Sequence, residues 1–251
     1  MSLIITYKHI DNIFVVSDTR ITKILVNENN QPETEYSTEG KVYKVGNIGY
    51  YMCWGTFSGI KTKLNLKIRR NEESLRDITD LKNLISNFLE ENIKTGEQLE
   101  FGVHISGFTN NNPKIYHVFH GINIESKKDI KNKIYKHHAH DHSDLRALYN
   151  GKQKQAHYLI SFLLHIERKI DKKVISAFNE EEIKEFLKMV VSYTSLSEDT
   201  VGGSVNIAKI THADITNIEN TELSEIELKK CLSFDLTSSA YEAAPTGSVE
   251  P

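Results

Sequence analysis

The stretch SLIITYKHIDNIFVVSDTR, residues 2–20, decides how the fold of this chain begins. Two runs rich in β-branched residues, 2–7 and 12–18, flank a turn-like His-Ile-Asp. This pattern predicts two paired strands. A hairpin of this kind brings the end of the second strand back beside the beginning of the first.

Downstream of this hairpin, strand-like and helix-like patterns alternate. The polar residues 27–40 are expected to form a loop. The pattern then predicts, in order, a hairpin split at Gly46-Asn47, a helix after Gly59, an amphipathic helix over residues 81–93, a hairpin over 101–120, two helices around 159–166 and 183–191, and a strand over 204–210. Strand pairs that alternate with helix pairs indicate an α+β fold, in which helices cover antiparallel sheets.

The length of 251 residues suits one globular domain with a substantial core. We expect this domain to span residues 1–215 and the remainder, 216–251, to be a C-terminal extension. The extension ends in the small, polar and proline-containing stretch SSAYEAAPTGSVEP, which predicts a partly flexible tail.

Composition excludes several classes of function. The net charge is -3, with acidic and basic residues interleaved, so the chain has no basic stripe for nucleic acid. No apolar run of 18 residues and no secretory signal occur, so neither membrane insertion nor export is expected. The two cysteines, Cys53 and Cys231, form neither a disulfide framework nor a cysteine zinc site, which favours the cytoplasm.

Three residues near the chain start could carry out nucleophilic catalysis. Removal of Met1 would give Ser2 a free α-amine, whose ordinary pKa of roughly 7.7–8.0 lets it accept the proton of the serine hydroxyl. The predicted hairpin returns Asp18 to this place, and Lys41 opens the next strand, although Lys44 competes for the same role. A lysine beside Asp18 stays charged and lowers the pKa of a neighbouring hydroxyl or amine. Each residue alone is also compatible with an ordinary structural role.

Gly55 follows the aromatic strand residues YYMCW, and its missing Cβ would let a substrate carbonyl approach the backbone N–H, as an oxyanion hole requires. A strand-ending glycine without any function is equally compatible with the pattern.

Taken together, Ser2, the Ser-Asp-Thr-Arg at 17–20, Lys41, the Trp-Gly at 54–55 and the Asp-Thr-Val-Gly-Gly at 199–203 resemble the N-terminal-nucleophile hydrolases of the proteasome β-subunit type. The resemblance extends to about Ile210 and implies a four-layer αββα sandwich. It implies hydrolysis of peptide bonds inside a homo-oligomeric ring, with a possible unfoldase partner and no cofactor.

The resemblance also implies a role for each matching residue. Ser2 would be the nucleophile, Asp18 would hold Lys41, and the Gly55 amide would stabilise the oxyanion, with Asp199 completing the catalytic set. Along the substrate groove the resemblance places Arg20, Trp54 and Cys53, the last at the floor of a side-chain pocket.

Some residues depart from the family pattern. Trp54 replaces a small residue, so we expect its bulk to reach into the groove, and Tyr149-Asn150-Gly151-Lys152 lacks the serine that supports the nucleophile in the family. These departures favour an alternative in which the chain is a catalytically inactive subunit of the same fold with a role in assembly or interaction.

A third hypothesis rests on the segment KHHAHDHSDL, residues 136–145. Its weak metal-ligand candidates are His138, His140 and His142, which would share one face of a strand. A polar segment flanked by lysine more often forms a solvated loop, and this is the structure that we expect here.

Overall fold

The structure is a computed structural model of the chain that describes residues 3–26, 31–55, 59–122, 127–150, 154–171 and 178–223. Ser2, the candidate nucleophile, lies outside these residues, as does the tail after Leu223. In the part of the chain that is described, no helix has the length and apolar character needed to cross a membrane.

The first sheet contains the N-terminal hairpin. Its strand order is β10-β1-β2-β11-β12, and every neighbouring pair is antiparallel. The strands are β1 (Ile4–His9), β2 (Asn12–Asp18), β10 (Ala147–Asn150), β11 (Ser204–Ile210) and β12 (Glu219–Glu222). Strand β12 extends this sheet beyond residue 215, where we expected the domain to end.

The second sheet has the order β5-β6-β7-β8-β9, again antiparallel throughout. Its strands are β5 (Val42–Val45), β6 (Gly49–Gly55), β7 (Phe101–Thr109), β8 (Asn112–Gly121) and β9 (Lys136–Asp141). Strand β9 corrects the expectation of a solvated loop, because the histidine-rich segment pairs with β8 along its length. Its alternate positions 138 and 140 lie on the same face as Phe119 and His117, so an imidazole-rich segment can be an edge strand when one face packs on aromatic rings.

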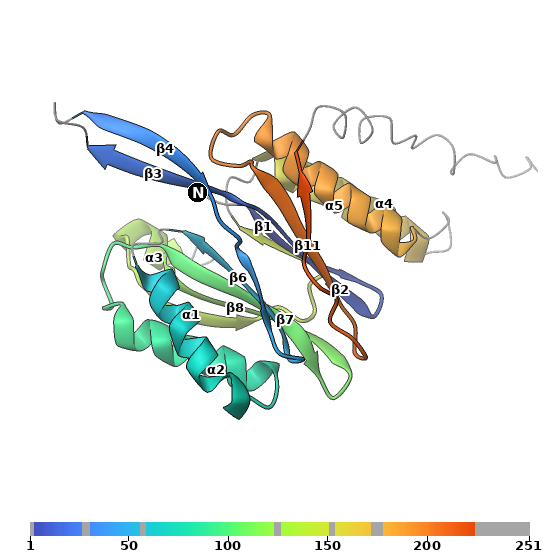
Figure 1. The fold of residues 1–251 in the computed structure, drawn as a ribbon, viewed down its shortest axis with the longest axis horizontal. Helices are drawn as coiled ribbons and strands as arrows, with labels where there is room; N and C mark the ends of the chain where they lie inside the picture. The colour runs from blue at the N-terminus through green and yellow to red at the C-terminus, as the bar shows by residue number, and fades with distance from the viewer. Residues whose placement is uncertain are drawn as a thin grey trace, which may run out of the picture.

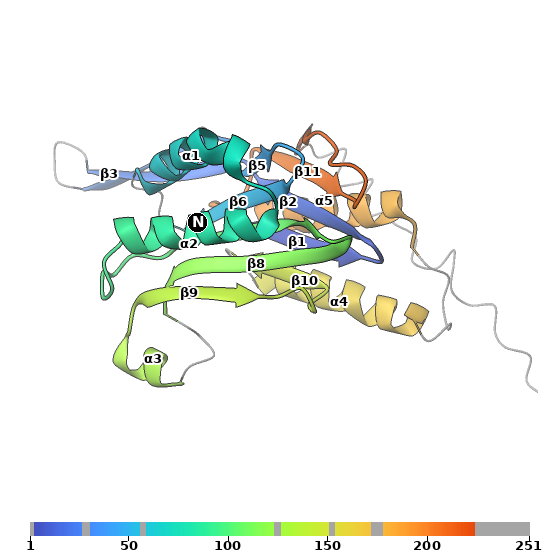
Figure 2. The same cartoon turned by 90° about the horizontal axis from the view of Figure 1, so that it is seen from below.

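The helices are α1 (Ile60–Asn71), the short 3-10 helix η1 (Glu72–Ser74), α2 (Ile78–Asn92), α3 (Lys127–Asn132), α4 (Lys154–Asp171) and α5 (Glu180–Ser195). The pairs α1 with α2 and α4 with α5 cover the outer faces of the two sheets (Figure 1), whereas α3 lies away from these layers, beyond β9 (Figure 2). Two of them begin at strong caps. The Asp77 carboxylate accepts the N–H groups of Thr79 and Asp80 at the start of α2, and Asn179 and Glu182 form a capping box at the start of α5.

The layers are α1 and α2, the second sheet, the first sheet, and α4 and α5 (Figure 1, Figure 2). Apolar residues fill the space between each pair of adjacent layers: Leu64, Ile85 and Val103 under α1 and α2, Ile13, Val15 and Met52 between the sheets, and Val16, Leu163 and Leu187 under α4 and α5. This four-layer αββα sandwich is the arrangement that the sequence resemblance implied.

The expected loop over residues 27–40 contains a strand that the sequence did not reveal. Strand β4 (Pro32–Thr38) pairs with β3 (Arg20–Val26), and the hairpin projects from one end of the sandwich (Figure 1). Most residues of β4 are exposed, so it has no apolar and polar alternation to mark it as a strand. The hairpin is inserted between Asp18 and Lys41, and its two strands bring these residues close together.

Candidate functional site

The N-terminal hairpin brings the start of the described chain to the end of β2. The Leu3 N–H donates to Asp18 Oδ1 at 2.9 Å, and the Asp18 N–H donates to the Leu3 carbonyl at 3.2 Å. Asp18 is completely buried. Ser2 is the residue bonded to Leu3, so the predicted proximity of Asp18 to the chain start holds as far as the described residues extend.

Lys41 is also completely buried and meets Asp18. Its Nζ donates to Asp18 Oδ1 at 2.7 Å and to the Arg20 carbonyl at 2.6 Å. The competing candidate, Lys44, donates instead to the carbonyl of Ile215. Of the two lysines, the structure therefore brings Lys41 to the carboxylate.

Burial changes the acidity of both members of this pair. Desolvation raises the pKa of Asp18, against the opposing effects of the Lys41 ammonium and of the N–H groups of Leu3 and Gly202. Desolvation likewise lowers the pKa of Lys41, against the opposing charge of Asp18. The site therefore contains an ammonium that gives up a proton more easily than an exposed lysine does.

The glycines of the segment 199–203 close the site from the side of β11. The Gly202 N–H donates to Asp18 Oδ2 at 3.2 Å, and the Gly202 carbonyl accepts from the N–H groups of Thr19 and Arg20. Gly202 has a φ of 154°, which favours glycine, and a Cβ there would lie 2.6 Å from Arg20 Cζ, so a larger residue would also have to displace the guanidinium. The Asp199 carbonyl accepts from Arg20 Nη1 at 2.8 Å, while Asp199 itself is exposed.

Gly55 lies at the end of β6 with a φ of 98°. A Cβ there would lie 2.2 Å from the carbonyl oxygen of Glu100. The space left by the missing Cβ is therefore filled by the main chain of Glu100, which gives this glycine a packing reason.

Trp54 and Cys53, the residues predicted to line the groove with Arg20, both pack against other parts of the protein. The Trp54 Nε1–H donates to His117 Nε2 at 3.1 Å, and its indole lies over Gly102, where a Cβ would be only 2.4 Å from the ring. The ring therefore packs against the neighbouring strand β7. Cys53 is fully buried in the core under α1 and α2, and burial raises the pKa of its thiol to about 12.

The histidines on β9 pack on aromatic rings. The rings of His138 and Phe119 stack with centroids 4.6 Å apart, and those of His140 and His142 stack at 5.7 Å. Over the described ranges, no three His, Cys, Asp or Glu side chains are arranged to hold a metal ion.

Two buried, ionisable side chains, His104 and Lys61, were not singled out in the sequence. His104 is buried between the sheets, where its Nε2 lies 2.6 Å from Asn150 Oδ1 and its Nδ1 lies 3.3 Å from Thr6 Oγ1. Burial lowers the pKa of His104 to about 3, so this imidazole stays neutral. The second is Lys61, a buried lysine on α1. Its signal was its position, three residues before Leu64 and seven before Ile68 on the apolar face of that helix.

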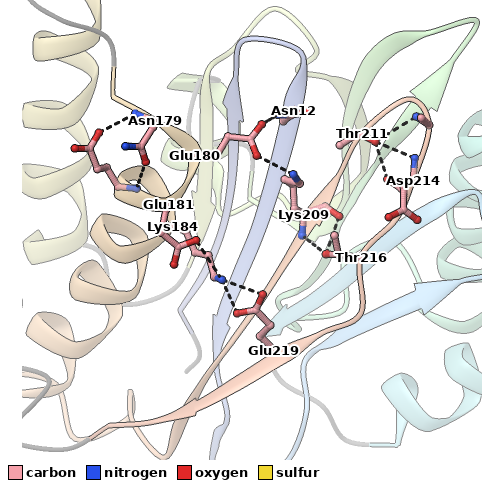
Figure 3. Close-up of polar contacts among 12 residues, drawn as sticks. Asn12, Asn179, Glu180, Glu181, Lys184, Lys209, Thr211, Asp214, Thr216 and Glu219 are labelled. Atoms are coloured by element: carbon pink, nitrogen blue, oxygen red, sulfur yellow. Dashed lines mark hydrogen bonds and ion pairs between the residues drawn. The ribbon is translucent and has the colours of Figure 1, made fainter.

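A second polar cluster lies at the other end of the first sheet, beside the start of β2 (Figure 3). Lys209 contacts Glu180, which also accepts from Asn12, and Lys184 contacts Glu219. The two lysines and their two glutamate partners line a pocket together with Phe14 and Ile207. All of the ion pairs in this cluster are partly exposed to water.

Comparisons with known proteins support the fold and correct the family. An Anbu mutant from Hyphomicrobium sp. strain MC1 matches with a TM-score of 0.58 and 9% identity, over 92% of this chain and 92% of that chain. This likeness shows a proteasome-like αββα fold. No family model and no curated protein match the chain. The assignment to the proteasome β-subunit family was therefore wrong, because what the two share at this identity is the fold alone.

Proposed function

We propose that this chain is an N-terminal-nucleophile hydrolase of amide bonds, in which removal of Met1 leaves Ser2 as the nucleophile. The observation that carries the proposal is the buried Asp18–Lys41 pair, because Asp18 is hydrogen-bonded to Leu3, the residue that follows Ser2. Buried ion pairs cost free energy to desolvate, and groups whose pKa is shifted by burial beside a specific partner are frequent at functional sites.

The reaction would proceed in two steps. The Ser2 hydroxyl attacks the carbonyl carbon while the α-amine of the same residue takes the hydroxyl proton. That proton then passes to the leaving nitrogen as the C–N bond breaks, which leaves an ester on Ser2. Water, activated by the same amine, hydrolyses the ester and restores the serine.

The remaining residues would stabilise charge during this reaction. The Lys41 ammonium lowers the pKa of the hydroxyl and of the amine, and Asp18 fixes the ammonium. The Gly55 N–H is proposed to donate to the tetrahedral oxyanion. Arg20 is proposed to fix the groove through its bond to the Asp199 carbonyl.

We further propose that the substrates are peptides or proteins and that the chain works as a cytoplasmic homo-oligomer. The proteasome-like fold supports this choice of substrate and assembly by analogy, and a partner that unfolds proteins would follow from it.

The proposal is tested by the intact mass of untagged protein after exposure to a small peptide epoxyketone, which reacts with a free α-amine and a neighbouring hydroxyl. We expect one adduct on a chain that lacks Met1. The matched control is Ser2→Ala, which keeps the free amine and should give no adduct. An unmodified wild-type chain that still carries Met1 would contradict the proposal and favour an inactive subunit with an assembly role.

A further inference from the structure

A second buried lysine lies next to the candidate site. Lys61 is in the first turn of α1, and its side chain is 4% exposed. An ammonium in such a place is costly unless hydrogen bonds and opposite charges compensate for the lost water. Its partners are therefore informative about why a lysine occupies this position.

Lys61 binds the two residues that precede Lys41. Its Nζ lies 2.5 Å from Glu39 Oε1 and donates to the Gly40 carbonyl at 3.3 Å. It also lies 5.4 Å from the centre of the Tyr43 ring, whose hydroxyl donates to the same carbonyl. The charge of Lys61 is thus directed at the main chain immediately before the candidate site.

Two main-chain hydrogen bonds also fix residues 39–41. The Glu39 N–H donates to the Thr19 carbonyl at 2.8 Å, and the Cys53 N–H donates to the Lys41 carbonyl at 3.4 Å. These contacts fix the main chain at 39–41, from which the Lys41 side chain extends to Asp18 and the Arg20 carbonyl.

We propose that Lys61 is a positioning residue for Lys41, which it serves by anchoring the Glu39–Gly40 segment and by facing the Lys41 ammonium with a second positive charge. Its importance for hydrolysis rests on the proposed function, but its effect on Lys41 does not.

Electrostatics support this role. The charged groups that act on Lys41 are Asp18 from β2, Glu39 from the preceding segment and Lys61 from α1. Burial is the main cause that lowers the pKa of Lys41, and Lys61 lowers it further, while Asp18 and Glu39 raise it. Removing the Lys61 charge should therefore raise the pKa of Lys41, and removing the Glu39 charge should lower it.

The test measures the pKa of Lys41 by NMR of protein labelled at the lysine Cε and Nζ atoms, with the Lys41 signal assigned by its loss in Lys41→Arg. In Lys61→Met we expect this pKa to rise by about 0.5–1 unit. Glu39→Gln, a substitution at a half-exposed side chain, should shift it the other way and gives a second reading if Lys61→Met folds poorly. Lys61→Arg keeps the charge and should leave the pKa unchanged.

The matched control is Lys63→Met, an exposed lysine on the same helix, which should behave as the wild type. The rate of epoxyketone adduct formation should fall about tenfold in Lys61→Met and recover in Lys61→Arg. An unchanged Lys41 pKa in both Lys61→Met and Glu39→Gln, or an equal shift in Lys63→Met, would overturn the inference. A wild-type protein that forms no adduct but shows the predicted pKa shifts would refute the proposed function and leave the positioning role standing.

Discussion

Two lysine–carboxylate pairs in this protein have the same length and opposite surroundings. Lys41 Nζ lies 2.7 Å from Asp18 Oδ1, and Lys209 Nζ lies 2.7 Å from Glu180 Oε2. Both side chains of the first pair are 0% exposed, whereas those of the second are 30% and 47% exposed. Water solvates and screens the second pair, so the equal distances do not mean equal energies.

The two pairs lie at opposite ends of the same strand, β2. Asp18 ends this strand, and Asn12, which contacts Glu180, begins it. At the Asp18 end, main-chain N–H groups of Leu3 and Gly202 complete the hydrogen bonding of the carboxylate. At the Asn12 end, the ion pairs that Lys184 and Lys209 form with glutamates are partly exposed to water. The first end therefore holds buried charges with main-chain hydrogen bonds, and the second holds partly exposed charges.

The largest effect should come from breaking the buried pair. Lys41→Met leaves Asp18 without its opposite charge in a dry environment, so we expect a loss of about 3–5 kcal/mol in the free energy of unfolding. Urea unfolding at neutral pH measures this loss. Adding Asp18→Asn to Lys41→Met removes the isolated carboxylate and should recover most of the stability. A single variant as stable as the wild type would mean that burial does not distinguish the two ends.

A smaller effect is expected from a change that disturbs packing in the second sheet and leaves both ion pairs intact. A Cβ on Gly102 would lie 2.4 Å from the Trp54 indole, so Gly102→Ala must displace that ring and should cost about 1–3 kcal/mol in the free energy of unfolding. Gly121→Ala is the matched control, because its Cβ would meet neighbours at an ordinary 3.7 Å. Thermal unfolding of both variants checks the difference. Equal stability would show that the indole has room to move.

Burial also predicts how the core responds to acid. The pKa of His104 falls from 6.5 to about 3 on burial, so the unfolded chain binds a proton between these values and the folded chain does not. Stability should therefore fall as the pH drops below about 6.5, by at most about 1.4 kcal/mol per pH unit from this group. Urea unfolding between pH 7 and 4 measures the slope, and His104→Gln should flatten it. The same slope in both proteins would contradict the assignment.

The sequence predicted those parts of the fold that have a regular apolar pattern. The spacing of Leu81, Ile85 and Phe88 predicted α2, and the β-branched runs predicted the hairpin that returns Asp18 to the chain start. Strand β4 could not be predicted, because a projecting hairpin with few buried side chains has no apolar face. Strand β9 was missed because its inner face carries imidazoles that pack on rings, instead of aliphatic residues.

The candidate site, like the fold, could be predicted from the sequence only in part. The proximity of Asp18 to the chain start followed from the pairing of two neighbouring strands. The contact between Asp18 and Lys41 was expected only from the family resemblance, because Lys41 precedes a strand of the other sheet. The orientation of Trp54 could not follow, because it depends on the absence of a side chain at Gly102 on a neighbouring strand. Lys61 was overlooked because a lysine on a helix is normally solvated, although its spacing from Leu64 and Ile68 places it on the buried face of α1. Its partners, Glu39 and Gly40, come from tertiary contacts that the sequence does not show.

The smallest effect should come from the exposed end. Lys209→Met removes the contact with Glu180, and Lys184→Met removes the contact with Glu219, but water replaces each lost partner. We expect each variant to lose less than about 1 kcal/mol in the free energy of unfolding at low salt. At about 1 M salt the Debye length falls to roughly 3 Å, so the loss should largely disappear there. Urea unfolding at both salt concentrations measures this, with Lys41→Met as the reference whose loss should persist. If the Lys209→Met loss were as large and as insensitive to salt, the exposed cluster would have to be dry in solution, and the contrast between the two ends of β2 would fail.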